Sequence, residues 1–282
     1  MLLLISAKTL LMLINTVILK TIIQLQTNMQ IIQHTRDFVI NNLSVSSKNI
    51  DLDKLMVIAE RLTKFTPPAP KKPKKQVQTT NANIPLYLKS GSVDIKNIKT
   101  GNIVVKNLTA RKMSIRRNKF YLDDIKAGVF DGIVKANVIV NLINSEIKLK
   151  STGEKINADK MVVQAANMKD TLSGTLKYKT ELSFVGGTPE QTMKSLKGYV
   201  DFEILKGQLG PFGKIENLIL SENIRESAVF SNVIGDVIKN MATINTSHFD
   251  KMTSKITFRN GIMNIGSIAT EGDCLSLLIF GK

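Results

Sequence analysis

The chain has 282 residues, a formal net charge of +16 at neutral pH and one cysteine, Cys274. A single cysteine excludes an intramolecular disulfide and a thiolate metal cluster, so we expect Cys274 to be a small buried apolar residue. The basic balance is typical of a protein with an anionic partner, nucleic acid or an anionic lipid surface, or simply of a solvated basic face. Aromatic residues make up only 5 % of a chain that is 43 % hydrophobic, which favours aliphatic strands over an aromatic-lined pocket.

The amino-terminal residues are apolar and allow three interpretations. Lys8, Asn15 and Lys20 interrupt the apolar stretch, and its longest uncharged run is shorter than the about 20 residues that span a bilayer. A signal peptide would need a basic start and a small-residue cleavage site, which are missing. The alternatives are therefore a pair of strands at 8–13 and 17–25, a weak membrane anchor or a signal peptide.

A further strand, with Phe38 and Ile50 near its ends, precedes a predicted helix at 53–64. Asp51 or Asp53 can cap this helix, and its apolar side chains share one face. Residues 66–83 then carry four prolines and four lysines, which predicts an extended or disordered linker. Its lysines either keep the linker soluble or touch acidic headgroups. Three segments result: 1–64, the linker 65–83, and a β domain at 84–282.

Strands repeat about every ten residues from residue 84 onward, which is typical of an antiparallel meander. They are expected at 85–89, 92–98, 101–108, 110–116, 119–130, 133–143, 146–151 and 175–184. Turn signals separate them at Ser90-Gly91, Thr100-Gly101, Asn118, Asp131-Gly132 and Asn144-Ser145.

Short helices interrupt the later part of the chain. Thr188 and Pro189 start one that runs to 196, a strand follows at 198–205, and two more helices are expected at 214–220 and 227–241. The Asn260-Gly261 signal predicts a hairpin between 255–258 and 262–268. The last predicted strand, 274–280, reaches the end of the sequence, which suggests a fragment of a longer protein.

The most informative stretch follows the Asp131-Gly132 turn signal, where every second residue is apolar. Successive side chains of a strand point to opposite faces, so this strand has one wholly apolar face. The same alternation recurs in 198–205. Such a face must either close on the helices 53–64 and 227–241 as an ordinary core or hold something apolar. The candidate lining residues are Val134, Ala136, Val138, Val140, Leu142, Val200, Phe202 and Ile204.

Catalytic and metal-binding patterns are weak. The two histidines, His34 and His248, have no partner at ligand spacing, and we expect no metal, cofactor or enzymatic activity. Asp123-Asp124 should face opposite sides of a strand and are interpreted as hairpin charge. A basic cluster at 111–119 has few aromatic residues for base stacking, so nucleic acid is not expected as a partner.

Several segments resemble the carboxyl-terminal region of the AsmA family. They are Phe130-Asp131-Gly132 with the strand to Leu142, residues 153–157, residues 196–202 leading into 206–210, Asn260-Gly261-Ile262, and 275–281. The resemblance covers about 84–281 and, in addition, 38–55.

The resemblance implies a mainly β protein: an elongated, twisted antiparallel β-sheet that forms an apolar groove, with a few short helices. Members of the family are anchored in the inner membrane of two-membraned bacteria and extend into the periplasm. They are similar to bridge-like lipid-transfer proteins and are linked to phospholipid movement and outer-membrane assembly. The expected partner is therefore phospholipid, and membrane or envelope proteins are further candidate partners. A non-catalytic structural or interaction domain of the envelope is the alternative.

Overall fold

A computed structural model describes residues 31–34, 37–55, 57, 86–167, 169–210, 247–272 and 277–279. The predicted amino-terminal strands or anchor, the linker 65–83 and the helices 214–220 and 227–241 lie outside these residues. So do most of the predicted helix 53–64 and Cys274.

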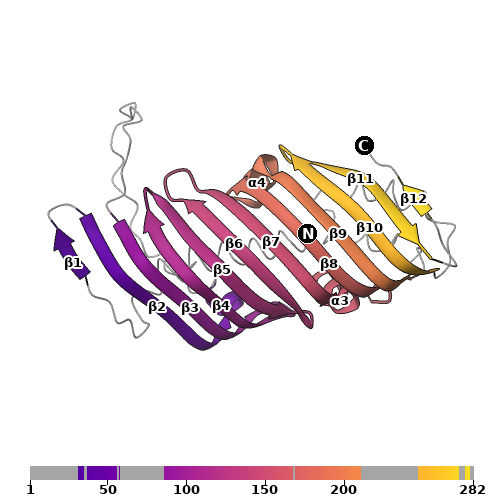
Figure 1. Cartoon of the computed structure of the whole chain (residues 1–282), viewed down its shortest axis with the longest axis horizontal. Coiled ribbons are helices and arrows are strands. Elements are labelled where there is room, and N and C mark those ends of the chain that lie inside the picture. The colour runs from indigo at the N-terminus through magenta and orange to yellow at the C-terminus, as the bar shows by residue number, and fades with distance from the viewer. Residues whose placement is uncertain are drawn as a thin grey trace. The chain divides into compact units, whose positions relative to one another are not determined.

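The described part of the chain is mainly β, as predicted. Its strands are hydrogen-bonded neighbours in the order in which they occur in the sequence, from β1 to β12 (Figure 1). The strands are β1 (Ile31–His34), β2 (Asp37–Asp51), β3 (Leu86–Thr100), β4 (Ile103–Arg116), β5 (Lys119–Val129), β6 (Gly132–Asn141), β7 (Glu146–Asn157), β8 (Leu172–Val185), β9 (Lys197–Leu209), β10 (Ser247–Arg259), β11 (Ile262–Glu271) and β12 (Leu277–Ile279).

The chain divides into two compact units, which are described separately. Unit 1 contains residues 1–125 and 139–145, and unit 2 contains residues 126–138 and 146–282. The divisions fall inside β5 and β6. Residues 134, 136 and 138 of the predicted apolar strand therefore belong to unit 2, and residues 140 and 142 belong to unit 1.

One strand pair in unit 1 corrects the prediction of an all-antiparallel sheet. β2 and β3 are parallel along their whole length, from Phe38 opposite Leu86 to Asp51 opposite Lys99. The sheet is therefore mixed. Alternation of apolar residues reports which face a side chain occupies but not the direction of the neighbouring strand, so the sequence pattern could not show this pairing.

The predicted turn at Ser90-Gly91 is wrong, because β3 runs through it without a break. The glycine has a packing role instead. A Cβ at Gly91 would meet the side chain of Met113 and the carbonyl oxygen of Leu43, at 2.5 and 2.7 Å. The strands predicted on either side of Thr109 are likewise one strand, β4.

The start of the predicted 53–64 helix is confirmed, with residues 52–55 and 57 helical. Asp51 is the cap, because its Oδ1 accepts a hydrogen bond from the backbone N–H of Lys54 at 3.1 Å. Asp53 has another task. Its carboxylate accepts the backbone N–H of Gly101 at 2.8 Å and the hydroxyl of Thr100 at 3.3 Å, which ties the helix start to the β3–β4 turn.

Unit 2 contains a helix that sequence reasoning missed, α3 (Ala158–Ala166). Asn157 caps it by accepting the backbone N–H of Lys160 at 2.9 Å, and Asp159 supplies a negative charge in the first turn. Asn followed by an acidic first turn is a helix-start signal that the analysis of the sequence overlooked. The predicted helix after Thr188 is confirmed as α4 (Pro189–Ser195), with Thr188 and Gln191 forming a capping box.

The predicted carboxyl-terminal hairpin is also confirmed. β10 and β11 are antiparallel, and Asn260 (φ 51°) and Gly261 (φ 80°) form the turn between them. Both positive φ values explain why Asn-Gly is favoured there.

Neighbouring strands β7, β8 and β9 are interrupted close to α3. Lys155 (φ 55°), Gly174 (φ 126°) and Lys206 (φ 48°) lie at or beside shifts in the strand register. Bulges bend and twist a strand locally. In β7, the bulge returns Ile156 to the buried side just before the chain enters α3.

Candidate functional site

One face of the unit 2 sheet is apolar from β7 to β10. The register places Ile147 opposite Phe184 and Leu149 opposite Leu182, and farther along the same face Val200 lies opposite Ile256. Because side chains alternate along each strand, the apolar members share this face. Its apolar residues are Ile147, Leu149, Leu176, Leu182, Phe184, Val200, Phe202, Ile204, Met252 and Ile256.

The opposite face of the same strands carries charge. Lys150 and Glu181 form an ion pair of 3.1 Å between β7 and β8, and Lys251 and Glu203 form one of 3.6 Å between β10 and β9. The sheet of unit 2 therefore has one apolar and one charged face, as the alternation predicts.

Most of the predicted lining residues in unit 2 lie on the protected side of their strands. Val138 is fully buried, Val200 and Ile204 are 8 % and 2 % exposed, and Val134 and Ala136 are half-buried. Their neighbours Ile133, Lys135 and Asn137 are exposed. In unit 1, Val140 is buried and Leu142 is half-buried; the backbone N–H of Leu142 bonds to the carbonyl of Asn118 at 2.8 Å.

The helices described in unit 2 contact only the ends of these strands. α3 packs on β7 and β8, and α4 packs on β8 (Figure 1). Ala158 of α3 belongs to a buried cluster with Ile156, Leu176 and Ile204, and Met161 packs against that cluster. Phe202, Val134 and Ile268 pack against the same cluster and remain half-buried.

The apolar face contains three hydroxyl side chains, Ser151, Tyr178 and Thr180, whose hydrogen bonds are made within the protein. Ser151 Oγ donates to the carbonyl of Lys135 at 3.0 Å and lies 3.1 Å from the hydroxyl of Tyr178. Thr180 Oγ1 donates to the carbonyl of Tyr199 at 2.6 Å. Burial raises the pKa of the Tyr178 phenol above 10.0, and its hydrogen bond with Ser151 opposes this by a smaller amount. The phenol is therefore neutral at physiological pH.

Ser254 differs from these residues. Its side chain is buried, opposite Phe202 on β9 and Ile268 on β11, and Oγ has no hydrogen-bond partner among the described residues. An unpaired buried hydroxyl is unfavourable by about 1–3 kcal/mol. Among the described residues of this face, Ser254 Oγ is thus the one buried side-chain polar atom without a hydrogen-bond partner.

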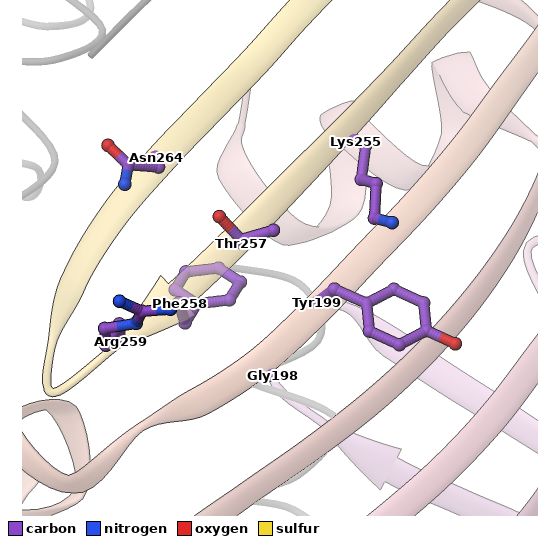
Figure 2. Close-up of a pocket in the computed structure, with 7 residues that line it drawn as sticks. All are labelled: Gly198, Tyr199, Lys255, Thr257, Phe258, Arg259 and Asn264. Carbon is purple, nitrogen blue, oxygen red and sulfur yellow. The ribbon is translucent and has the colours of Figure 1, made fainter.

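A pocket of about 460 Å³ lies on the other side of the sheet, at the α4 end of β9, β10 and β11 (Figure 2). Tyr199, Thr257 and Asn264 face each other across the register. The Lys255 ammonium lies over the Tyr199 ring, 5.3 Å from its centre. The lining consists of Gly198, Tyr199, Lys255, Thr257, Phe258, Arg259 and Asn264. Sequence reasoning missed this site, since it depends on β9 pairing with β10, strands separated by residues 210–246.

The structure also places some of the histidine and acidic residues considered as candidate ligands or catalytic groups. No group of three or more His, Cys, Asp or Glu side chains is placed to hold a metal ion there. His248 is exposed on β10, opposite Gln208. Asp124 has φ 54°, so the predicted alternation fails at Asp123-Asp124, and Asp124 pairs with Lys112 at 3.1 Å. Among the described helices, none combines the length and hydrophobicity that crossing a membrane requires.

Comparison with known proteins identifies no relative: no family model, no curated protein and no solved structure matches the chain. The resemblance to the AsmA family stays a prediction.

Proposed function

We propose that the protein binds phospholipid by holding its acyl chains against the apolar face of the unit 2 sheet. The observation that supports this most directly is the separation of the two faces from β7 to β10: Leu149, Leu182 and Val200 share one face, while Lys150 and Glu181 share the other.

Apolar contact is the chemistry this face offers. The half-buried members of this face, such as Phe202 and Ile256, contribute about 25 cal/mol for each Å² that an apolar partner removes from water. The hydroxyls of Ser151 and Thr180 already have protein acceptors, so the ligand does not need to supply them. Such a surface selects for acyl chains and discriminates little between headgroups.

The larger role follows from the resemblance to the AsmA family. We propose that the chain is an envelope protein of a two-membraned bacterium and conducts phospholipid between membranes in support of outer-membrane assembly. It would do so without enzymatic activity.

The experiment is gentle purification of the full chain followed by mass spectrometry of bound lipid. Phospholipid is expected to co-purify and to remain at high salt, because apolar contact is not screened by ions. The matched pair of variants is Phe202→Gln and Leu205→Gln, three residues apart on β9 and on opposite faces. Phe202→Gln should reduce the bound lipid severalfold, and Leu205→Gln should leave it unchanged, with both folds checked by circular dichroism.

Three results would contradict the proposal. Lipid no higher than in an unrelated protein of similar charge would favour a structural or interaction domain instead. Equal retention of lipid by the two variants would show that the apolar face is not the binding surface. Absorbance at 260 nm that is lost at high salt would instead indicate nucleic acid.

A further inference from the structure

The pocket between β9, β10 and β11 combines positive charge with neutral hydrogen-bonding groups. Lys255 and Arg259 lie on the same face of β10, four residues apart, and both are exposed. Thr257 contributes a hydroxyl, Asn264 contributes a side-chain amide, and Tyr199 contributes its aromatic ring. Figure 2 shows Thr257, Arg259 and Asn264 on one side of the view and the Lys255 ammonium beside the Tyr199 ring on the other.

The positive charge in this pocket is not neutralised by a carboxylate. Neither Lys255 nor Arg259 forms an ion pair with a described residue, whereas Lys251 on the same strand pairs with Glu203 at 3.6 Å. Asp201 lies opposite Lys255 in the register, but it is outside the lining and no ion pair joins the two. The contact of Lys255 with Tyr199 is a cation–π contact, which orients the ammonium group without cancelling its charge.

We propose that this pocket binds the phosphate group of a phosphomonoester. The Arg259 guanidinium can engage two oxygens of such a dianion at once, and the Thr257 hydroxyl and the Asn264 amide can donate to others. The Lys255 side chain adds a second positive charge to the same pocket. The volume of about 460 Å³ is in the range of small-molecule sites. The phosphate can belong to a free metabolite or to the headgroup of a membrane lipid, because both present the same group.

The pocket is separate from the apolar face. Tyr199 alternates with Val200 along β9, so their side chains leave the sheet on opposite sides. A phospholipid with its acyl chains against Val200 cannot place its phosphate next to Tyr199 within the same sheet. The phosphate site is therefore independent of the proposed acyl-chain site.

The test measures binding of glycerol 3-phosphate to the full chain by titration calorimetry at low ionic strength. A second arm measures flotation with phosphatidylcholine vesicles that contain or lack phosphatidic acid. The pocket variant is Lys255→Gln/Arg259→Gln. Its control is Lys177→Gln/Lys179→Gln on β8. This variant removes the same number of positive charges from the same face of the sheet, but outside the pocket.

We expect saturable binding that the pocket variant weakens by at least about tenfold, while the control variant binds like the original protein. If glycerol 3-phosphate binds, the site takes free phosphomonoesters. If the chain binds only the vesicles that contain phosphatidic acid, and not glycerol 3-phosphate, the site takes lipid headgroups. Lack of binding in both arms, or equal weakening by the two variants, overturns the proposal.

Measuring the lipid that co-purifies with the pocket variant distinguishes the failure of this proposal from the failure of the acyl-chain proposal. The pocket variant can lose phosphate binding and still carry co-purified lipid. Conversely, the original protein can bind phosphate and carry no co-purified lipid.

Discussion

The hydroxyl of Tyr178 lies 3.1 Å from Oγ of Ser151, within the apolar face of the unit 2 sheet. While the phenol is neutral, the one hydroxyl proton of Ser151 is directed to the carbonyl of Lys135, and Tyr178 is the donor in this contact. When Tyr178 ionises, the Ser151 proton can turn to the phenolate, which is why this hydrogen bond lowers the Tyr178 pKa. Two polar side chains are thereby accommodated between Leu149 and Leu176, with their hydrogen bonds kept inside the sheet.

This contact predicts a loss of stability at alkaline pH. The pKa of Tyr178 is raised by burial in the folded protein, so the neutral phenol is favoured in that state. Its contribution is fully present below pH 10 and is lost as the pH rises from the unfolded pKa, near 10, toward the folded one. Urea unfolding followed by circular dichroism should show this decline, and Tyr178→Phe should make it smaller.

The same variant should lower the free energy of unfolding by about 1 kcal/mol near pH 8, because one hydrogen bond is lost. An unchanged alkaline decline would mean that Tyr178 ionises equally easily in both states.

Opposite faces of β6 should respond differently to a new negative charge. Val138 is fully buried and Lys135 is exposed. Val138→Asp should lower the free energy of unfolding by more than about 3 kcal/mol, because an unpaired carboxylate enters an apolar environment. Lys135→Asp should change it by less than about 1 kcal/mol. Similar losses in the two variants, measured by urea unfolding, would contradict the assignment of faces.

Gly153 lies directly opposite Tyr178, and a Cβ there would overlap the Tyr178 ring. Gly153→Ala should therefore destabilise the protein by about 2 kcal/mol through overpacking. Gly266→Ala is the matched control, since a Cβ at that exposed strand position meets no atom closer than 3.4 Å.

A double-mutant cycle identifies the cause of this loss. Tyr178→Leu should reduce the penalty of Gly153→Ala, because the ring is what the new methyl group meets. Additive effects would place the strain elsewhere.

The carboxylate of Asp53 should stabilise unit 1 through the β3–β4 turn. Asp53→Ala removes the acceptor for Gly101 and Thr100 and should cost about 1 kcal/mol. Asp53→Asn keeps one acceptor oxygen and should retain part of this. The adjacent Lys54→Ala removes only an exposed ion pair with Asp51 and should be nearly neutral. A loss for Lys54→Ala as large as that for Asp53→Ala, in thermal unfolding, would contradict this role.

The sequence predicted those features that depend on residues close together in the chain. Alternation placed Val138 on the buried side of its strand, the Thr188-Pro189 pair marked α4, and Asn260-Gly261 marked the last hairpin. In each case the determining interaction is within a turn or between successive side chains.

The remaining features depend on residues that only the fold brings together. Gly91 resembles a turn residue until Met113 of β4 is placed against it. The phosphate pocket requires Tyr199 of β9 beside Thr257 of β10, and no local pattern encodes that pairing. The apolar face was predictable, whereas its one unsatisfied hydroxyl, at Ser254, was not.

The parallel pairing of β2 with β3 has a consequence for biosynthesis. Partner residues such as Ser44 and Ser92 are 48 positions apart, so β2 leaves the ribosome well before the strand that pairs with it. Hairpins such as β3–β4 can close as soon as their second strand has been made. Contacts between distant segments form slowly, because the intervening chain must first lose entropy. During translation, the edge of β2 that pairs with β3 therefore stays unpaired until β3 has been made. In refolding followed by pulse-labelling hydrogen exchange, the amides of β2 should become protected after those of β4.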